Sequence, residues 1–109
     1  MKAIILAGAC ALAFAGSSTF AADPTANWTK HCASCHGKDG KGETKAGKKA
    51  GVKDQTDAKY QESLTDDKMF QAVKEGYKED GKEKMKPFRD KLTDDEVKAL
   101  VAFVRSLKK

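Results

Sequence analysis

The sequence predicts an all-α fold of three to four helices joined by long loops. Three stretches begin with a residue that caps a helix N-terminus, followed by a helical pattern, near Asp23, Thr65 and Thr93. No segment after residue 22 shows the alternation of apolar and polar residues that is typical of a strand. The intervening segments 37–63 and 77–92 are polar and contain most of the glycines, so we expect loops there.

The first 21 residues predict a secretory signal peptide. Lys2 supplies a positive start, and residues 3–15 are apolar or small throughout. This run is too short for a membrane span and has the length of a signal-peptide core. We place cleavage after Ala21, with cleavage after Ala22 and an uncleaved anchor as alternatives. We therefore expect a periplasmic protein without stable membrane insertion, with residues 22–109 as its single domain.

A first helix is expected from about Pro24 to Cys35. Asp23 is a suitable N-cap, and proline is favoured at the first helical position. Trp28 lies one turn before Cys32 on this helix. The helix ends in the motif Cys32-Ala33-Ser34-Cys35-His36.

This C-x-x-C-H motif is typical of a c-type haem attachment site. Two cysteines three positions apart can both form thioethers with the vinyl groups of one haem, and the adjacent His36 can then ligate its iron. We therefore predict one covalently bound haem c, attached through Cys32 and Cys35. Cys10 falls within the signal peptide, and we do not expect it to be a lipid attachment site because the apolar run before it is too short.

The polar segment from Gly37 to Ser63 is long for a loop inside a small domain, and wrapping around a cofactor would explain its length. Val52 and Tyr60 are its candidates for contact with the haem. A second helix is expected after Thr65, with Leu64, Met69, Phe70 and Val73 on one face and Gly76 at its end.

The final helix follows Thr93, where Thr93 and Glu96 form a capping-box pattern. It should run to about Leu107. Its expected buried face consists of Val97, Leu100, Val101, Val104 and Leu107, with Phe103 at the edge.

Three residues are candidates for the second axial ligand of the iron. Met85 lies in the second loop, close to the stiffening Pro87, and we favour it. Met69 lies in the apolar face of a helix, where core packing is the simpler interpretation. His31 directly precedes Cys32 and is expected on the same side of the haem as His36. A methionine–histidine pair raises the reduction potential, and two filled axial positions favour an electron carrier over an oxygenase or peroxidase.

The chain resembles the class I c-type cytochromes of the small bacterial soluble kind. The resemblance implies the cytochrome c fold, in which the terminal helices cross, Trp28 packs near Phe103 and Leu100, and His36 and Met85 lie on opposite faces of the haem. The residues that carry it are Trp28, 32–42, 69–76, 85–88, 92–97 and 99–107.

Two departures from the family pattern concern the iron ligands. Lys86 separates Met85 from Pro87, where the family often has proline directly after the methionine. The family also often has a proline in the loop after the motif, and the backbone carbonyl of that proline orients the ligand histidine. Residues 38–86 contain no proline, so another backbone carbonyl, between Gly42 and Val52, is expected to accept the ring proton of His36.

The chain is small and basic. It has 109 residues and a formal net charge of +5, and loss of the signal peptide, whose only charge is on Lys2, leaves 20 basic and 16 acidic residues. A domain of this size buries little apolar area, so we expect the protein without haem to be poorly folded. Because no aromatic residues are interleaved with the lysines and the protein is expected to be exported, nucleic acid is not an expected partner.

These observations predict a monomeric, non-enzymatic electron-transfer protein whose partners are redox proteins, with acidic docking surfaces as one possibility. The alternative is a haem-bearing electron-entry subunit of a specific oxidoreductase. A thiol–disulfide oxidoreductase would need a strand–helix–strand context for Cys32 and Cys35, which the sequence lacks. A zinc site would need four ligands from His31, Cys32, Cys35 and His36 within about one helical turn.

Overall fold

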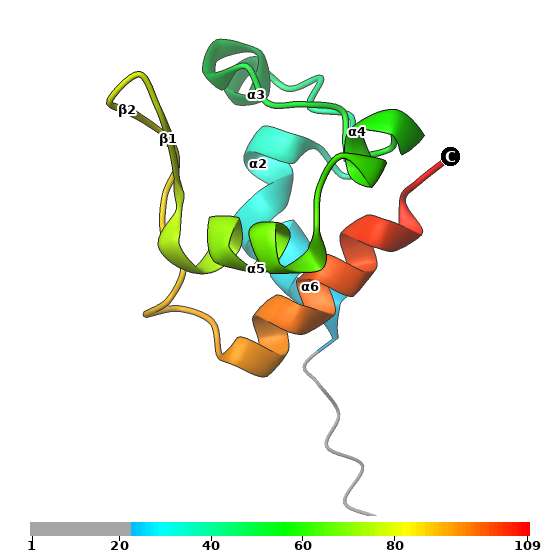
Figure 1. The fold of residues 1–109 in the computed structure, drawn as a ribbon, viewed down its shortest axis with the longest axis vertical. Helices are drawn as coiled ribbons and strands as arrows, with labels where there is room; N and C mark the ends of the chain where they lie inside the picture. Colours follow the sequence, from blue (N-terminus) through cyan, green and yellow to red (C-terminus); the bar gives the residue numbers. More distant parts are fainter. Residues whose placement is uncertain (1–22) are drawn as a thin grey trace, which may run out of the picture.

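The computed structural model describes residues 23–109, which form a mostly helical domain (Figure 1). The signal peptide, its cleavage site and Cys10 lie outside the described residues. The elements, in chain order, are α1 (Pro24–Asn27), the π-helix η1 (Trp28–Cys32), α2 (Ala33–His36), α3 (Lys45–Ala50), α4 (Ala58–Glu62), α5 (Asp66–Glu75), β1 (Tyr77–Glu79), β2 (Lys82–Met85) and α6 (Asp94–Ser106).

The first three elements form one continuous helix, close to the predicted Pro24–Cys35. It begins at Pro24, where the Asp23 carboxylate accepts a hydrogen bond of 2.9 Å from the Thr25 amide. The π-helical turn was not predicted; in it, the Ala33 amide donates to the Trp28 carbonyl five residues back. Such turns are rare and often lie at functional sites. Here Trp28 and Cys32, at its two ends, are both buried.

The predicted starts of the two longer helices are confirmed. The Thr65 hydroxyl accepts from the Lys68 amide at 3.1 Å, and α5 ends before Gly76. Thr93 and Glu96 form the expected capping box, with bonds of 3.0 and 3.1 Å. These caps satisfy amides that have no partner inside the helix.

Helix α6 packs against α1 and α5 to form the core. Its predicted inner face is confirmed: Val97, Leu100 and Val101 are buried, and Val104 and Leu107 are partly buried. The Trp28 and Phe103 rings lie 5.2 Å apart, and Leu100 belongs to the same core cluster, as the family resemblance implied.

The expectation of a structureless loop over 37–63 is wrong, because two short helices form there. The Thr44 hydroxyl caps α3 by accepting from Gly47 at 2.8 Å, and the Asp57 carboxylate caps α4 by accepting from Tyr60 at 3.2 Å. Counting residues 24–36 as one helix, residues 23–109 contain five helical segments rather than three to four. Local side-chain caps, and not an apolar stripe, begin both short helices.

The expectation that no strand forms is also wrong, since β1 and β2 form an antiparallel hairpin within the predicted second loop. Asp80 and Gly81 at its tip have φ angles of 52° and 76°. Two consecutive positive φ angles fit the turn that Asp-Gly pairs favour in two-residue hairpins. Most of the hairpin is exposed, so it shows no apolar alternation.

Side-chain hydrogen bonds hold α4 against α6. The Gln61 side chain is fully buried, and its amide group donates to the carbonyls of Gln55 and Val104. Arg105 donates to the carbonyls of Gln61 and Leu64, both at 2.6 Å. These bonds hold segment 55–64 against the C-terminal helix. Within residues 23–109, no helix has the length and apolar character needed to cross a bilayer.

Candidate functional site

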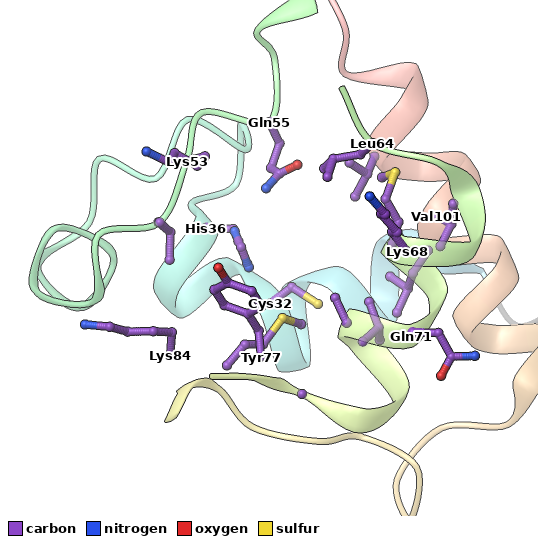
Figure 2. Close-up of a pocket in the computed structure, with 18 of the residues that line it drawn as sticks. Cys32, His36, Lys53, Gln55, Leu64, Lys68, Gln71, Tyr77, Lys84 and Val101 are labelled. Atoms are coloured by element: carbon purple, nitrogen blue, oxygen red, sulfur yellow. The ribbon is translucent and has the colours of Figure 1, made fainter. Parts of the chain in front are cut away.

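A cavity of about 620 Å³ lies between the N-terminal helix, α5 and α6, the segment 50–55 and the hairpin (Figure 2). Its volume is within the usual range of small-molecule and cofactor sites. Apolar side chains form most of its wall, among them Trp28, Val52, Leu64, Met69, Val73, Met85, Leu100, Val101 and Val104.

The N-terminal helix places two of the predicted site residues in the wall of this cavity. Cys32 and His36 both line it, whereas the half-buried Cys35 lies on the same helix outside the lining. Residues three or four apart share one face of a helix, so Cys32, Cys35 and His36 are close neighbours. Neither cysteine forms a disulfide bond.

The environment of Cys32 does not suit thiol chemistry. Burial, with a smaller contribution from Cys35, raises the pKa of its thiol to about 11. Reactive cysteines of disulfide oxidoreductases have lowered pKa values, because the thiolate is the nucleophile. This observation counts against the thiol–disulfide alternative.

The His36 ring projects into the cavity in Figure 2, and its centre lies 5.7 Å from that of Trp28. Burial lowers the pKa of His36, which favours the neutral imidazole that binds metals. Its Nδ1 atom is buried and has no hydrogen-bond partner among the described residues. The expected acceptor, a backbone carbonyl between Gly42 and Val52, is therefore not found.

Three hydrogen bonds fix the end of the motif helix. The Trp28 indole donates to the Gly37 carbonyl at 3.0 Å, and the Gly42 amide donates to the His36 carbonyl at 2.7 Å. The Thr44 hydroxyl, which caps α3, also donates to the Cys35 carbonyl at 2.6 Å. The role of Thr44 was not predicted, although threonine is a favoured capping residue at the start of a helix.

Both candidate methionines line the cavity. Met85 is half-buried at the end of β2, and Met69 is 8% exposed on α5. The backbone after Met85 is held against α5 by a bond of 3.0 Å from the Phe88 amide to the Val73 carbonyl. His31 lies outside the lining, with its ring edge-on to Phe88 at 5.5 Å.

Polar residues line two sides of the cavity: Lys68 and Gln71 lie on the α5 side, and a second group lies opposite them (Figure 2). Val52 and Tyr60, predicted as contacts from the long loop, both line the cavity, as do Lys53, Gln55, Tyr77 and Lys84. Burial raises the pKa of the Tyr60 hydroxyl. Lys53 and Lys84 lie on the side opposite α5, with their ammonium groups pointing away from the cavity (Figure 2).

The residues of this site fit a haem better than an isolated metal ion. Within residues 23–109, no group of three or more histidine, cysteine, aspartate or glutamate side chains could hold a metal ion, so a zinc site is not supported. A half-buried imidazole whose pKa is lowered, two cysteines on the same helix that form no disulfide, and a large apolar wall are what a covalently attached haem requires.

Comparisons with known proteins agree with this geometry. Residues 19–104 match the family model described as cytochrome C oxidase, cbb3-type, subunit III. The structure titled KustC0563 c-type cytochrome is 39% identical, with a TM-score of 0.72, over 80% of this chain and 99% of that one. A tyrosine-to-phenylalanine mutant of that protein is 38% identical, with a TM-score of 0.69, over 79% and 99%. Among curated proteins, none matches the chain significantly.

The fold and the cavity define the class as a haem-binding helical domain, and the comparisons define the family. The chain belongs to the cytochrome c family. Members of this family are typically electron carriers rather than enzymes, and c-type cytochromes are usually extracytoplasmic.

Proposed function

We propose that the protein carries single electrons between periplasmic redox partners on one covalently bound haem c. The observation that carries this proposal is the meeting of Cys32, His36 and Met85 around one apolar cavity. Cys32 and Cys35 would form the thioether bonds, and His36 and Met85 would be the axial ligands. When bound, the haem supplies the one-electron chemistry by alternating between ferrous and ferric iron.

The residues of the chain would tune and shield this site. The neutral imidazole of His36 and the soft sulfur of Met85 together favour a raised reduction potential. The buried wall of α5 and α6 would exclude water, and with both axial positions filled there is no position left for oxygen or a substrate. The protein would therefore transfer electrons without chemical conversion of a substrate.

The proposed location and partners follow from the sequence. The predicted signal peptide supports export to the periplasm, and redox proteins are the expected partners of a monomeric carrier. An electron-entry subunit of an oxidoreductase is the second candidate, favoured by the matching family model, whose description names an oxidase subunit. Stable co-purification with a partner enzyme would separate this candidate from a free carrier.

The ligand assignment can be tested with two methionine variants of the haem-loaded protein. Met85→Ala should lower the reduction potential and let carbon monoxide bind to the ferrous form, because an axial position opens. Met69→Leu is the matched control and should change neither property. An unchanged spectrum and potential in Met85→Ala would refute the assignment.

Covalent attachment is tested separately by acid–acetone extraction of the denatured protein. The pigment should stay with the polypeptide, because thioether bonds survive the extraction. Release of all pigment, or its absence in protein expressed with haem-maturation machinery, would overturn the proposed function.

A further inference from the structure

The net charge of the described domain is confined to one segment. Residues 38–53, here named the cationic segment, contain six lysines and two acidic residues, a net charge of +4. The other described residues, 23–37 and 54–109, carry 14 basic and 14 acidic side chains. The segment therefore accounts for the whole net charge, although lysines are spread along the entire chain.

The charges of the cationic segment are free to face a partner. Five of its lysines are exposed, and Lys41 is half-buried. The ion pairs of the described residues join Lys74 to Asp94, Arg89 to Glu75 and Arg105 to Asp66, so none involves this segment. None of these lysines is therefore held in a close ion pair, although the carboxylates of Asp39 and Glu43 lie within the segment and that of Asp54 borders it.

The cationic segment is also a rigid surface. Thr44 caps α3 and bonds to the Cys35 carbonyl, and Gly47 packs so closely on that carbonyl that a side chain there would overlap it. The Gln55 amide donates to the Gly40 carbonyl at 2.8 Å and closes the segment at its base. A preorganised surface loses little conformational entropy when it binds a partner.

The segment lies directly beside the cavity. Its last residues, 50–53, form part of the cavity wall, and Thr44 and Gly47 contact the motif helix through Cys35. A partner bound to this surface would be adjacent to the proposed haem. The hairpin on another part of the cavity wall has three lysines and three acidic residues between Tyr77 and Met85, so it offers no such charge.

We infer that the cationic segment is the docking surface for an acidic redox protein, an inference that rests on the proposed function. Complementary charge steers two proteins toward a productive orientation and raises the association rate, most strongly at low salt. A membrane surface fits the segment less well. Membrane-binding surfaces insert large apolar side chains, whereas the segment exposes alanine and glycine between its charges, and the exposed large apolar residue of the described chain is Tyr77 on the hairpin.

Charge reversal at two places on the haem-loaded protein tests this inference. One variant carries Lys45→Glu, Lys48→Glu and Lys49→Glu in the segment. The matched control carries Lys78→Glu, Lys82→Glu and Lys98→Glu, which are exposed lysines outside it. Both variants change the net charge by the same amount, so any difference between them reports the position of the charge. The probe is a reduced plant-type [2Fe–2S] ferredoxin, an acidic one-electron donor.

Stopped-flow measurements give the second-order rate of reduction at ionic strengths of about 0.01 M and 0.15 M, where the Debye length is about 30 Å and 8 Å. The segment variant should lose about tenfold or more of the wild-type rate at the lower salt. The control should lose much less, and the three proteins should converge as salt rises. Equal losses in both variants, or no loss in the segment variant, would overturn the inference.

Four further measurements keep the outcomes distinct. Carbodiimide cross-linking to the ferredoxin should join its carboxylates to lysines 45–49, and links mainly to the hairpin would contradict the proposed surface. Co-sedimentation with vesicles of anionic phospholipid that is lost only in the segment variant, without a change in the ferredoxin rate, would favour a membrane instead. The absorption spectrum, and the rate at which the small cation tris(phenanthroline)cobalt(III) oxidises the reduced protein, show whether the haem transfers electrons in each variant. Failure of the docking inference is therefore distinguishable from failure of the proposed function.

Discussion

Gly47→Ala is a direct test of how α3 is joined to the motif helix. On helix propensity alone, alanine in place of glycine would stabilise α3 by about 1 kcal/mol. The structure predicts the opposite sign, because a Cβ atom at Gly47 would overlap the Cys35 carbonyl oxygen and lie 2.7 Å from that of Gly42. Both are backbone atoms, so the overlap can be relieved only by moving α3 away from the motif helix.

The size of the effect follows from two costs and one gain. Overpacking a tight site costs about 1–3 kcal/mol. Loss of the Thr44–Cys35 hydrogen bond, 2.6 Å long here, adds about 1 kcal/mol. After the gain in helix propensity, we expect a net loss of about 1–3 kcal/mol, or a fall in Tm of roughly 5–20 °C for a domain of this size.

Urea unfolding of the haem-loaded protein, followed by far-ultraviolet circular dichroism, measures this change. Ala46→Gly at the exposed neighbouring position is the matched control and should lose about 1 kcal/mol through helix propensity alone. A Gly47→Ala protein that is as stable as the wild type, or more stable, would show that α3 does not pack closely on the motif helix.

Three further predictions concern the core, the capping box and the cavity. Trp28→Phe should lower the free energy of unfolding by about 1–3 kcal/mol, because the buried Gly37 carbonyl loses its indole donor. Urea titration measures this change, and an unchanged unfolding midpoint would contradict the prediction. Hydrogen bonds from Thr93 and Asn27 hold the pKa of Glu96 below its ordinary value of 4.5, so the stability they provide is present above that pH and is lost as the pH falls through the lowered pKa. Glu96→Gln should therefore be less stable than the wild type at pH 7, with a difference that shrinks in acid, and a constant difference would refute the linkage. Replacing Cys32 and Cys35 with alanine prevents covalent attachment of haem. The variant should show little cooperative thermal unfolding, because the apolar wall of a cavity of about 620 Å³ would be exposed to water. A sharp transition at the wild-type temperature would refute this.

The parts of the fold that were predicted correctly are those encoded by local chemistry or by helical periodicity. Asp23, Thr65 and Thr93 begin the three expected helices because their side chains accept bonds from amides two or three residues ahead. The inner face of α6 follows from the spacing of its apolar residues. Val52 and Tyr60 were identified because they are among the few apolar side chains in a polar segment, and both line the cavity.

The parts that were missed lack an apolar pattern. The hairpin is mostly exposed, so only the Asp80-Gly81 pair signalled it. Helix α3 buries Gly47 and no large side chain, so its position depends on a close backbone contact that periodicity cannot reveal. The choice between Met69 and Met85 rests on chain context, because both reach the cavity.

The π-helical turn at Trp28–Cys32 sets the phase between the two halves of the N-terminal helix. A regular α-helix advances by about 100° per residue, so deletion of one residue in this turn would rotate the preceding half by that angle relative to the half that carries Cys35 and His36. The amino-terminal turn would then face away from α6, even though every remaining residue kept a helical conformation. A single additional residue thus allows the first turn of this helix to pack on α6 while Cys32 and His36, further along it, line the cavity.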